Sequence, residues 1–202
     1  MAYTLTSLLT EFYARGFDYL NDGGAGVTRA TRWVNDAMHA IDEYANWPYL
    51  EATTTGSSPL TIADLRVPDV VFDVTNQRVL SQRSSGELAQ WAGDLSTTGP
   101  PNSYYVSAGT TVNVYPANVV SLSVRYWKFG PDLSSGSDTP LMPDRFRSAI
   151  VDYAVAAAMR DDESPDAIVA QAAGDLTVAR MKDWASSLAP EYTLTALVGD
   201  DS

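Results

Sequence analysis

Residues 103–129, SYYVSAGTTVNVYPANVVSLSVRYWKF, decide the fold that this sequence predicts. Apolar and polar side chains alternate along them, so that Leu122, Val124 and Tyr126 share one face of an extended segment. Such alternation is typical of half-buried strands, and short turn-forming segments separate one run from the next. The expected strands are residues 103–106, 111–115 and 119–129. Because connections this short leave no room for a crossover helix, we predict an antiparallel meander.

The chain before this strand-rich region has helical spacing. Apolar residues that recur every three or four positions predict two amphipathic helices. We expect Thr28 to cap the second helix and Pro48 to mark its end, because the residue before a proline disfavours helix. The apolar stripes are Leu5, Leu8, Leu9, Phe12 and Gly16 in the first helix, and Trp33, Ala37, Ile41 and Tyr44 in the second.

Helical spacing returns near the other end of the chain. Pro143 fits the first position of a third helix, where its missing N–H has no intrahelical partner to lose. Ser164 and Pro165 predict the cap and first residue of a fourth helix, which we expect to end near Leu188. The stripes are Phe146, Ile150, Tyr153 and Ala157 in the third helix, and Ile168, Ala172, Leu176, Ala179 and Trp184 in the fourth. Their many alanines suit close packing within one subunit or between identical subunits.

Together these patterns predict an α+β fold. We expect a bundle of about four helices, residues 1–50 and 131–188, with an antiparallel β domain, residues 51–130, inserted between its two pairs. Residues 189–202 are expected to form an extended C-terminal arm. Its bulky apolar residues are Tyr192, Leu194, Leu197 and Val198. The arm is either a frayed terminus or a segment that docks on a neighbouring sheet or groove.

The composition narrows the classes of function. With 13 basic and 25 acidic residues the net charge is −12, which argues against binding to nucleic-acid phosphates. The absence of cysteine excludes disulfides, thiolate metal sites and a cysteine nucleophile. We expect no secretory signal, because residues 1–7 are not basic and Glu11 interrupts any apolar run. The longest apolar run, residues 154–159, is too short to cross a bilayer, so we predict a soluble protein.

No motif in the sequence predicts catalysis, a metal site or a cofactor. The single histidine, His39, lies in the second expected helix and lacks a nucleophile motif that would complete a catalytic triad. Two alternatives stay open. Aromatic residues in the strands could stack on sugars in a carbohydrate-binding module, and two of the acids could serve a virion-associated cell-wall hydrolase. The aromatic candidates are Tyr104, Tyr105, Tyr115 and Trp127.

Five stretches, in this order and spacing, resemble the phage head-to-tail adaptor proteins, also called head completion or connector proteins. All of them combine proline or aromatic residues with turn formers, next to an expected strand or helix. They are WPYL at residues 47–50, LRVPDVV at 65–71, GPPNSYY at 99–105, the pair VNVYP and LSVRYW within 112–127, and DTPLMPDRF at 138–146. The likeness extends over residues 28–160.

This resemblance implies a structural protein of the virion without enzymatic activity, cofactor or membrane contact. Such adaptors form a dodecameric ring beneath the portal protein, at the neck between head and tail, after synthesis in the host cytoplasm. They extend the channel through which DNA passes without sequence-specific binding, and they dock stopper or tail proteins. We therefore expect the arm to contact the portal or a neighbouring subunit through Tyr192, Leu194, Leu197 and Val198.

Overall fold

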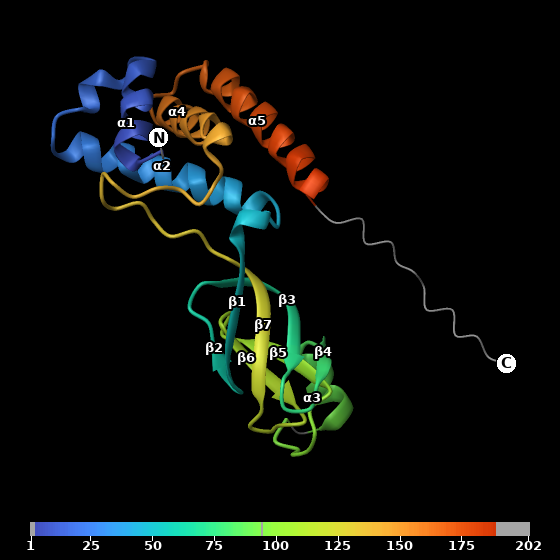
Figure 1. Cartoon of the computed structure of the whole chain (residues 1–202). Helices are drawn as coiled ribbons and strands as arrows, with labels where there is room; N and C mark the ends of the chain where they lie inside the picture. Colours follow the sequence, from blue (N-terminus) through green and yellow to red (C-terminus); the bar gives the residue numbers. More distant parts are fainter. Residues whose placement is uncertain (1–2, 94, 189–202) are drawn as a thin grey trace.

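The computed structural model describes residues 3–93 and 95–188, which form an elongated molecule with helices at one end and a sheet at the other (Figure 1). The helices of the helical part are α1 (Leu5–Phe12), α2 (Ala25–Tyr44), α4 (Ser148–Asp161) and α5 (Ala167–Leu188). Helix α4 packs against α1, α2 and α5, so it is the centre of this part. None of the described helices is both long and apolar enough to span a membrane.

The first two helices bury the stripes that the sequence predicts, with two exceptions. Leu5, Leu8, Leu9 and Phe12 are all buried, but Tyr44 is 60% exposed at the end of α2. Gly16 lies beyond the end of α1, is exposed and has a φ of 105°, so its place in the first stripe was wrong. The predicted cap of α2 was wrong, because the helix begins three residues before Thr28. There the carboxylate of Asp22 accepts hydrogen bonds from the backbone N–H groups of Gly24 and Gly26. These bonds satisfy donors of the first turn that have no intrahelical partner.

The strands form one seven-stranded sheet in the order β1-β7-β3-β4-β5-β6-β2. They are β1 (Glu51–Ser57), β2 (Leu60–Thr61), β3 (Leu65–Asp73), β4 (Arg78–Gln82), β5 (Ser103–Ser107), β6 (Thr111–Tyr115) and β7 (Ser121–Lys128). The two strands at the ends of this order, β1 and β2, are separated in the chain only by Ser58 and Pro59. The sheet must therefore curl until its two ends meet, which gives a nearly closed barrel.

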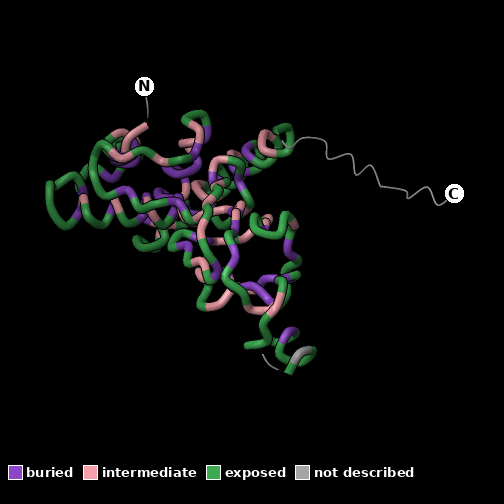
Figure 2. Tube along the Cα trace, turned by 60° about the horizontal axis from the view of Figure 1, so that its bottom comes forward, coloured by how far each residue is buried: buried purple, intermediate pink, exposed green. Residues whose placement is uncertain are grey.

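The buried side chains form two clusters, one in each part of the molecule (Figure 2). The helical cluster includes Trp33, Trp47 and Ile150, whereas the sheet encloses a smaller cluster with Val71 and Leu122 near its centre. The side chains of the second cluster come from alternate positions of the strands, as expected for a sheet with one buried face. Each part thus has its own core. The predicted division into domains (1–50 with 131–188, and 51–130) stays a prediction.

The predicted meander was wrong for its third strand. Strands β5 and β6 form a hairpin, but β7 lies between β1 and β3 and does not pair with β6. After Tyr115 the chain does not turn back, because the N–H of Ala117 donates to the carbonyl of Thr97. That bond leads the chain across the end of the barrel, and the carbonyl of Val120 then accepts from the N–H of Ser58 beside β1.

The predicted fold class was also wrong. The described residues hold five α-helices, because α3 (Ser85–Ala92) lies within the strand-rich segment. The sheet is mixed rather than antiparallel, since β4 and β5 run parallel and pair Ser81 with Ser103. It is therefore not a small antiparallel insertion in a four-helix bundle. The predicted C-terminal arm lies outside the described residues.

Candidate functional site

Helix α5 carries an apolar face that nothing in the described chain covers. Ile168, Val169 and Leu176 are 78%, 70% and 57% exposed, and Ala172 and Ala179 between and beyond them are exposed too. Four of these positions belong to the stripe that the sequence predicts for this helix. The stripe is present, and of the two packings left open by the sequence, the described chain does not cover it within the subunit. Such a face on a surface helix indicates a contact with another molecule.

The opposite side of α5 explains this orientation. Gly174 lies against Tyr153 of α4, where an added Cβ would come within 3.1 Å of the ring. The Tyr153 hydroxyl donates a hydrogen bond of 2.5 Å to the Asp175 carboxylate. Burial, followed by this hydrogen bond and the charge of Asp175, raises the pKa of Tyr153, so the phenol stays protonated. Gly174 thus lets α5 sit close to α4 on the side that buries Val178 and Met181, and the opposite side carries Ile168 and Leu176.

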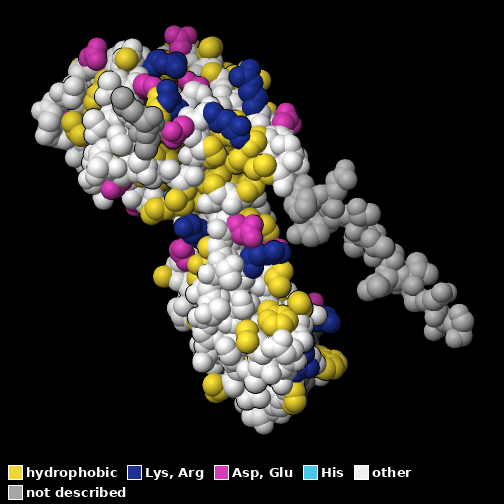
Figure 3. Space-filling view, in the orientation of Figure 1, with side chains coloured by type: hydrophobic (Ala, Val, Ile, Leu, Met, Phe, Trp, Pro, Cys, Tyr) yellow, Lys and Arg dark blue, Asp and Glu magenta, His cyan; other side chains and the backbone are white. Residues whose placement is uncertain are grey.

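A groove of about 660 Å³ separates the helical part from the sheet. Trp47 and Pro48 line it from the segment that follows α2, Trp127 from β7, and Lys182 and Leu188 from α5. Figure 3 shows hydrophobic side chains gathered at this junction, beside basic and acidic ones. Leu188, the last residue of α5 that the structure describes, lies at the rim of this groove.

The two chain segments that join the parts meet around Asp42. This carboxylate is 3% exposed and accepts a hydrogen bond of 2.9 Å from the Tyr49 hydroxyl. Burial raises the pKa of Asp42 to about 6, against the opposing effects of the Tyr49 hydrogen bond and of the neighbouring His39 and Arg66 side chains. Gly130 packs on Asp42 so closely that an added Cβ would clash with the carboxylate. The Asp42 carboxylate therefore holds together the two chain segments that connect the helical part to the sheet part.

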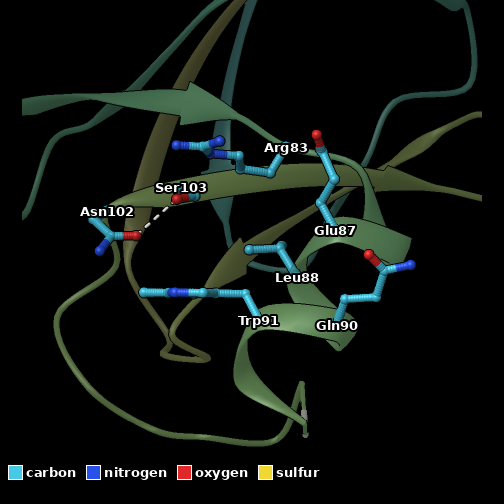
Figure 4. A pocket seen from close by; sticks show the side chains of 7 residues that line it. All are labelled: Arg83, Glu87, Leu88, Gln90, Trp91, Asn102 and Ser103. Atoms are coloured by element: carbon cyan, nitrogen blue, oxygen red, sulfur yellow. Dashed lines mark hydrogen bonds between the residues drawn. The ribbon is translucent and has the colours of Figure 1, made fainter.

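A second hollow, of about 500 Å³, lies beside α3 in the sheet part. The side chains that line it are Arg83, Glu87, Leu88, Gln90, Trp91, Asn102 and Ser103 (Figure 4). Trp91 is 77% exposed, whereas Trp33 and Trp47 are buried in the helical core. The sequence gives Trp91 no predicted role, although the spacing of Ser84 and Glu87 is that of a capping box and signals a helix here.

The structure shows where some of the candidate residues from the sequence lie and how exposed they are. The interface candidates Tyr192, Leu194, Leu197 and Val198 lie outside the described residues. Tyr104 and Tyr115 are only 3% and 4% exposed, so these two cannot stack on sugars as the carbohydrate alternative requires. His39 contacts Asp132 at 2.6 Å on the surface. Within residues 3–93 and 95–188, no group of three or more histidine and acidic side chains is placed to hold a metal ion.

Comparison with known families decides what kind of protein carries these surfaces. The family described as SU10 adaptor protein matches residues 4–192, nearly the whole chain. The chain belongs to this adaptor family. The predicted membership of the phage head-to-tail adaptors is thereby confirmed, and the match reaches beyond the motif-bearing region, residues 28–160, into both ends. No curated protein matches the chain.

Membership gives the surfaces described above a context. An SU10-type adaptor is a structural component of a phage virion that contacts other head and tail proteins. The exposed face of α5, the groove and the hollow beside α3 are three surfaces of this adaptor where such contacts can form. The match also includes the four residues after α5, so the beginning of the predicted arm belongs to the sequence that the family shares.

Proposed function

We propose that this adaptor assembles into a dodecameric ring beneath the portal, where it extends the DNA channel and docks stopper or tail proteins. The observation that carries the proposal is the uncovered face of α5. Alanines at positions 172 and 179 alternate there with Ile168 and Leu176, so the helix of a neighbouring copy can approach closely and bury the larger side chains. Burying a Leu or Ile side chain contributes about 1.5–3 kcal/mol.

The charge of the chain agrees with a channel for DNA. A net charge of −12 disfavours binding to the phosphate backbone, so DNA can pass the ring without being held. The sheet part projects away from the helices (Figure 1), which makes it suited to meet the stopper or tail proteins while the helices pack around the ring. The role needs no enzymatic activity and no cofactor. The proposed location is the neck of the virion.

The arm completes the proposal. Tyr192, Leu194, Leu197 and Val198 are apolar residues that follow α5 in the sequence, and we assign them to contacts with the portal or with a neighbouring subunit. Leu188 lies at the rim of the groove between the two parts, so the arm starts at a surface rather than in a core. An extended segment of this kind can bind by adding to a sheet or by filling a groove.

Electron microscopy of the purified chain mixed with its portal tests the ring. We expect rings on the portal for the natural sequence and none for Leu176→Glu, because the new charge would be buried between α5 helices. Ser187→Glu is the matched control, since Ser187 is an exposed polar residue of the same helix and should leave the rings intact. Rings of normal appearance with Leu176→Glu would refute the role given to this face.

A further inference from the structure

The hollow beside α3 has the features of a binding site for a protein segment. Leu88 is 3% exposed and lies between Arg83 and Trp91, and these three side chains point to the same side (Figure 4). Tyr115 supports the Trp91 ring from its edge, with ring centroids 6.5 Å apart. Exposed tryptophan and arginine around a buried leucine are typical of the residues that dominate binding at protein interfaces.

The position of Trp91 is fixed by the ends of its helix. The side chains of Ser84 and Glu87 form a capping box at the start of α3, and Gly93 ends the helix in the left-handed conformation with φ of 69°. At its end the N–H of Gly93 donates to the carbonyl of Ala89. The caps hold the helix backbone that carries Trp91, so less conformational entropy is lost when a partner binds there.

The charge beside Trp91 selects the partner. Among the described residues, the Arg83 guanidinium has no hydrogen-bond or ion-pair partner. The nearby Glu87 carboxylate accepts from both the N–H and the hydroxyl of Ser84, and these two bonds lower the pKa of Glu87 more than Arg83 does. Glu87 also lines the hollow, but its side chain runs in a different direction from that of Arg83 (Figure 4). The hollow therefore presents an available cation next to an apolar surface, and its complement is a segment with apolar residues followed by a carboxylate.

The chain itself carries such a segment. Residues 197–201 read LVGDD, in which Leu197 and Val198 precede Asp200 and Asp201. We propose that this segment of a neighbouring copy occupies the hollow, with Leu197 or Val198 against Trp91 and Leu88 and an aspartate on Arg83. The nine residues that follow Leu188, up to Leu197, can span about 30 Å when extended. The inference rests on the proposed self-assembly, because it assigns the receiving surface for the arm.

A charge exchange tests the inference in solution, without a ring or a portal. The probe is a labelled synthetic peptide of residues 189–202, and the receptor is the full chain carrying Asp200→Lys and Asp201→Lys, so that its own arm does not compete. We expect fluorescence anisotropy to show binding that weakens about tenfold or more when Arg83→Glu is added to the receptor. Trp91→Ala should weaken it similarly. Arg32→Glu, a reversal at an exposed arginine of α2, is the matched control and should change nothing.

The reverse pair makes the test specific. A peptide with lysine at positions 200 and 201 should bind a chain that carries Arg83→Glu and keeps its natural aspartates at 200 and 201 more tightly than it binds the natural chain. Binding that ignores the charge at position 83, or that is lost instead with Lys182→Glu in the groove, would overturn the inference. Equal weakening by Arg32→Glu would do the same, because it would show attraction by net charge alone.

Competition by the chain's own arm identifies the source of the segment. The natural chain, kept dilute enough to be monomeric, should bind the peptide as tightly as the receptor with the lysine arm. Weaker binding by about tenfold would show that a chain's own arm fills its hollow, which would refute the neighbour as the occupant. Rings on the portal could still form in that case, so microscopy distinguishes a failure of this inference from a failure of the proposed function.

Discussion

Replacing Asp42 by asparagine should stabilise the protein at neutral pH. It should also make the free energy of unfolding depend less on pH. Burial raises the pKa of this carboxyl from 3.8 to about 6, so the folded state binds its proton more tightly than the unfolded state. Stability from this group is therefore greatest below pH 4 and is lost as the pH rises through about 6. A shift of about two units corresponds to about 3 kcal/mol at pH 7, because each unit is about 1.4 kcal/mol.

Asparagine keeps the shape and an oxygen that can accept from the Tyr49 hydroxyl, but it cannot ionise. The free energy of unfolding of Asp42→Asn should thus exceed that of the natural chain by up to about 3 kcal/mol at pH 7. Near pH 4 the two proteins should be almost equal. Urea denaturation followed by circular dichroism at pH 4, 5, 6 and 7 measures this difference directly. The other titrating groups are shared by both proteins, so their contributions cancel.

A second variant checks the cause. The Tyr49 hydrogen bond opposes the effect of burial, so Tyr49→Phe should raise the pKa of Asp42 further and steepen the loss of stability above pH 5. A difference between Asp42→Asn and the natural chain that stays constant from pH 4 to pH 7 would refute the reasoning. So would a lower stability of Asp42→Asn at pH 7.

Three further substitutions probe local features. Gly26→Ala should cost about 1–3 kcal/mol, measured by urea denaturation, because the new Cβ would lie 2.4 Å from the Leu20 carbonyl oxygen. Trp47→Phe should lower the free energy of unfolding by about 1–3 kcal/mol, since it leaves the buried Ile41 carbonyl without its 2.6 Å hydrogen bond. Ser84→Ala should speed amide hydrogen exchange in α3 by a factor of about five, as expected for a lost cap of about 1 kcal/mol, and leave exchange in α4 unchanged.

Elements with strong local signals could be predicted from the sequence. The stripe of Leu5, Leu8, Leu9 and Phe12 predicts α1, and the alternation around Val124 predicts β7. Both patterns are formed by residues close together in the sequence, so no distant contact is needed to recognise them. The capping box of Ser84 and Glu87 also signals α3, although the expected fold contained no helix there. Reading that motif would have corrected the number of helices.

Features that depend on distant partners could not be predicted. Nothing near Tyr115 in the sequence shows that the next strand pairs with β1 and β3, because this pairing is set by hydrogen bonds to residues around 58 and 97. The outward face of α5 has the same origin. Ile168 and Leu176 look like core residues by spacing alone, and only the close approach of Gly174 to Tyr153 decides which side of the helix is buried. The stripe was found, but its direction required the structure.

The pairing of Glu51 with Trp127 has a consequence for how such proteins change over time. The chain enters the sheet part at Glu51 and leaves it beside Trp127, and these residues are partners across two antiparallel strands. Their Cα atoms are thus about 5 Å apart, close enough for a short turn to join them. Recombination can therefore replace the segment between them at a single place, provided that the contacts of Arg66 with Ala45 and of Trp127 with the helical core are kept. A phage can in this way keep the helical part of its adaptor and vary the sheet part.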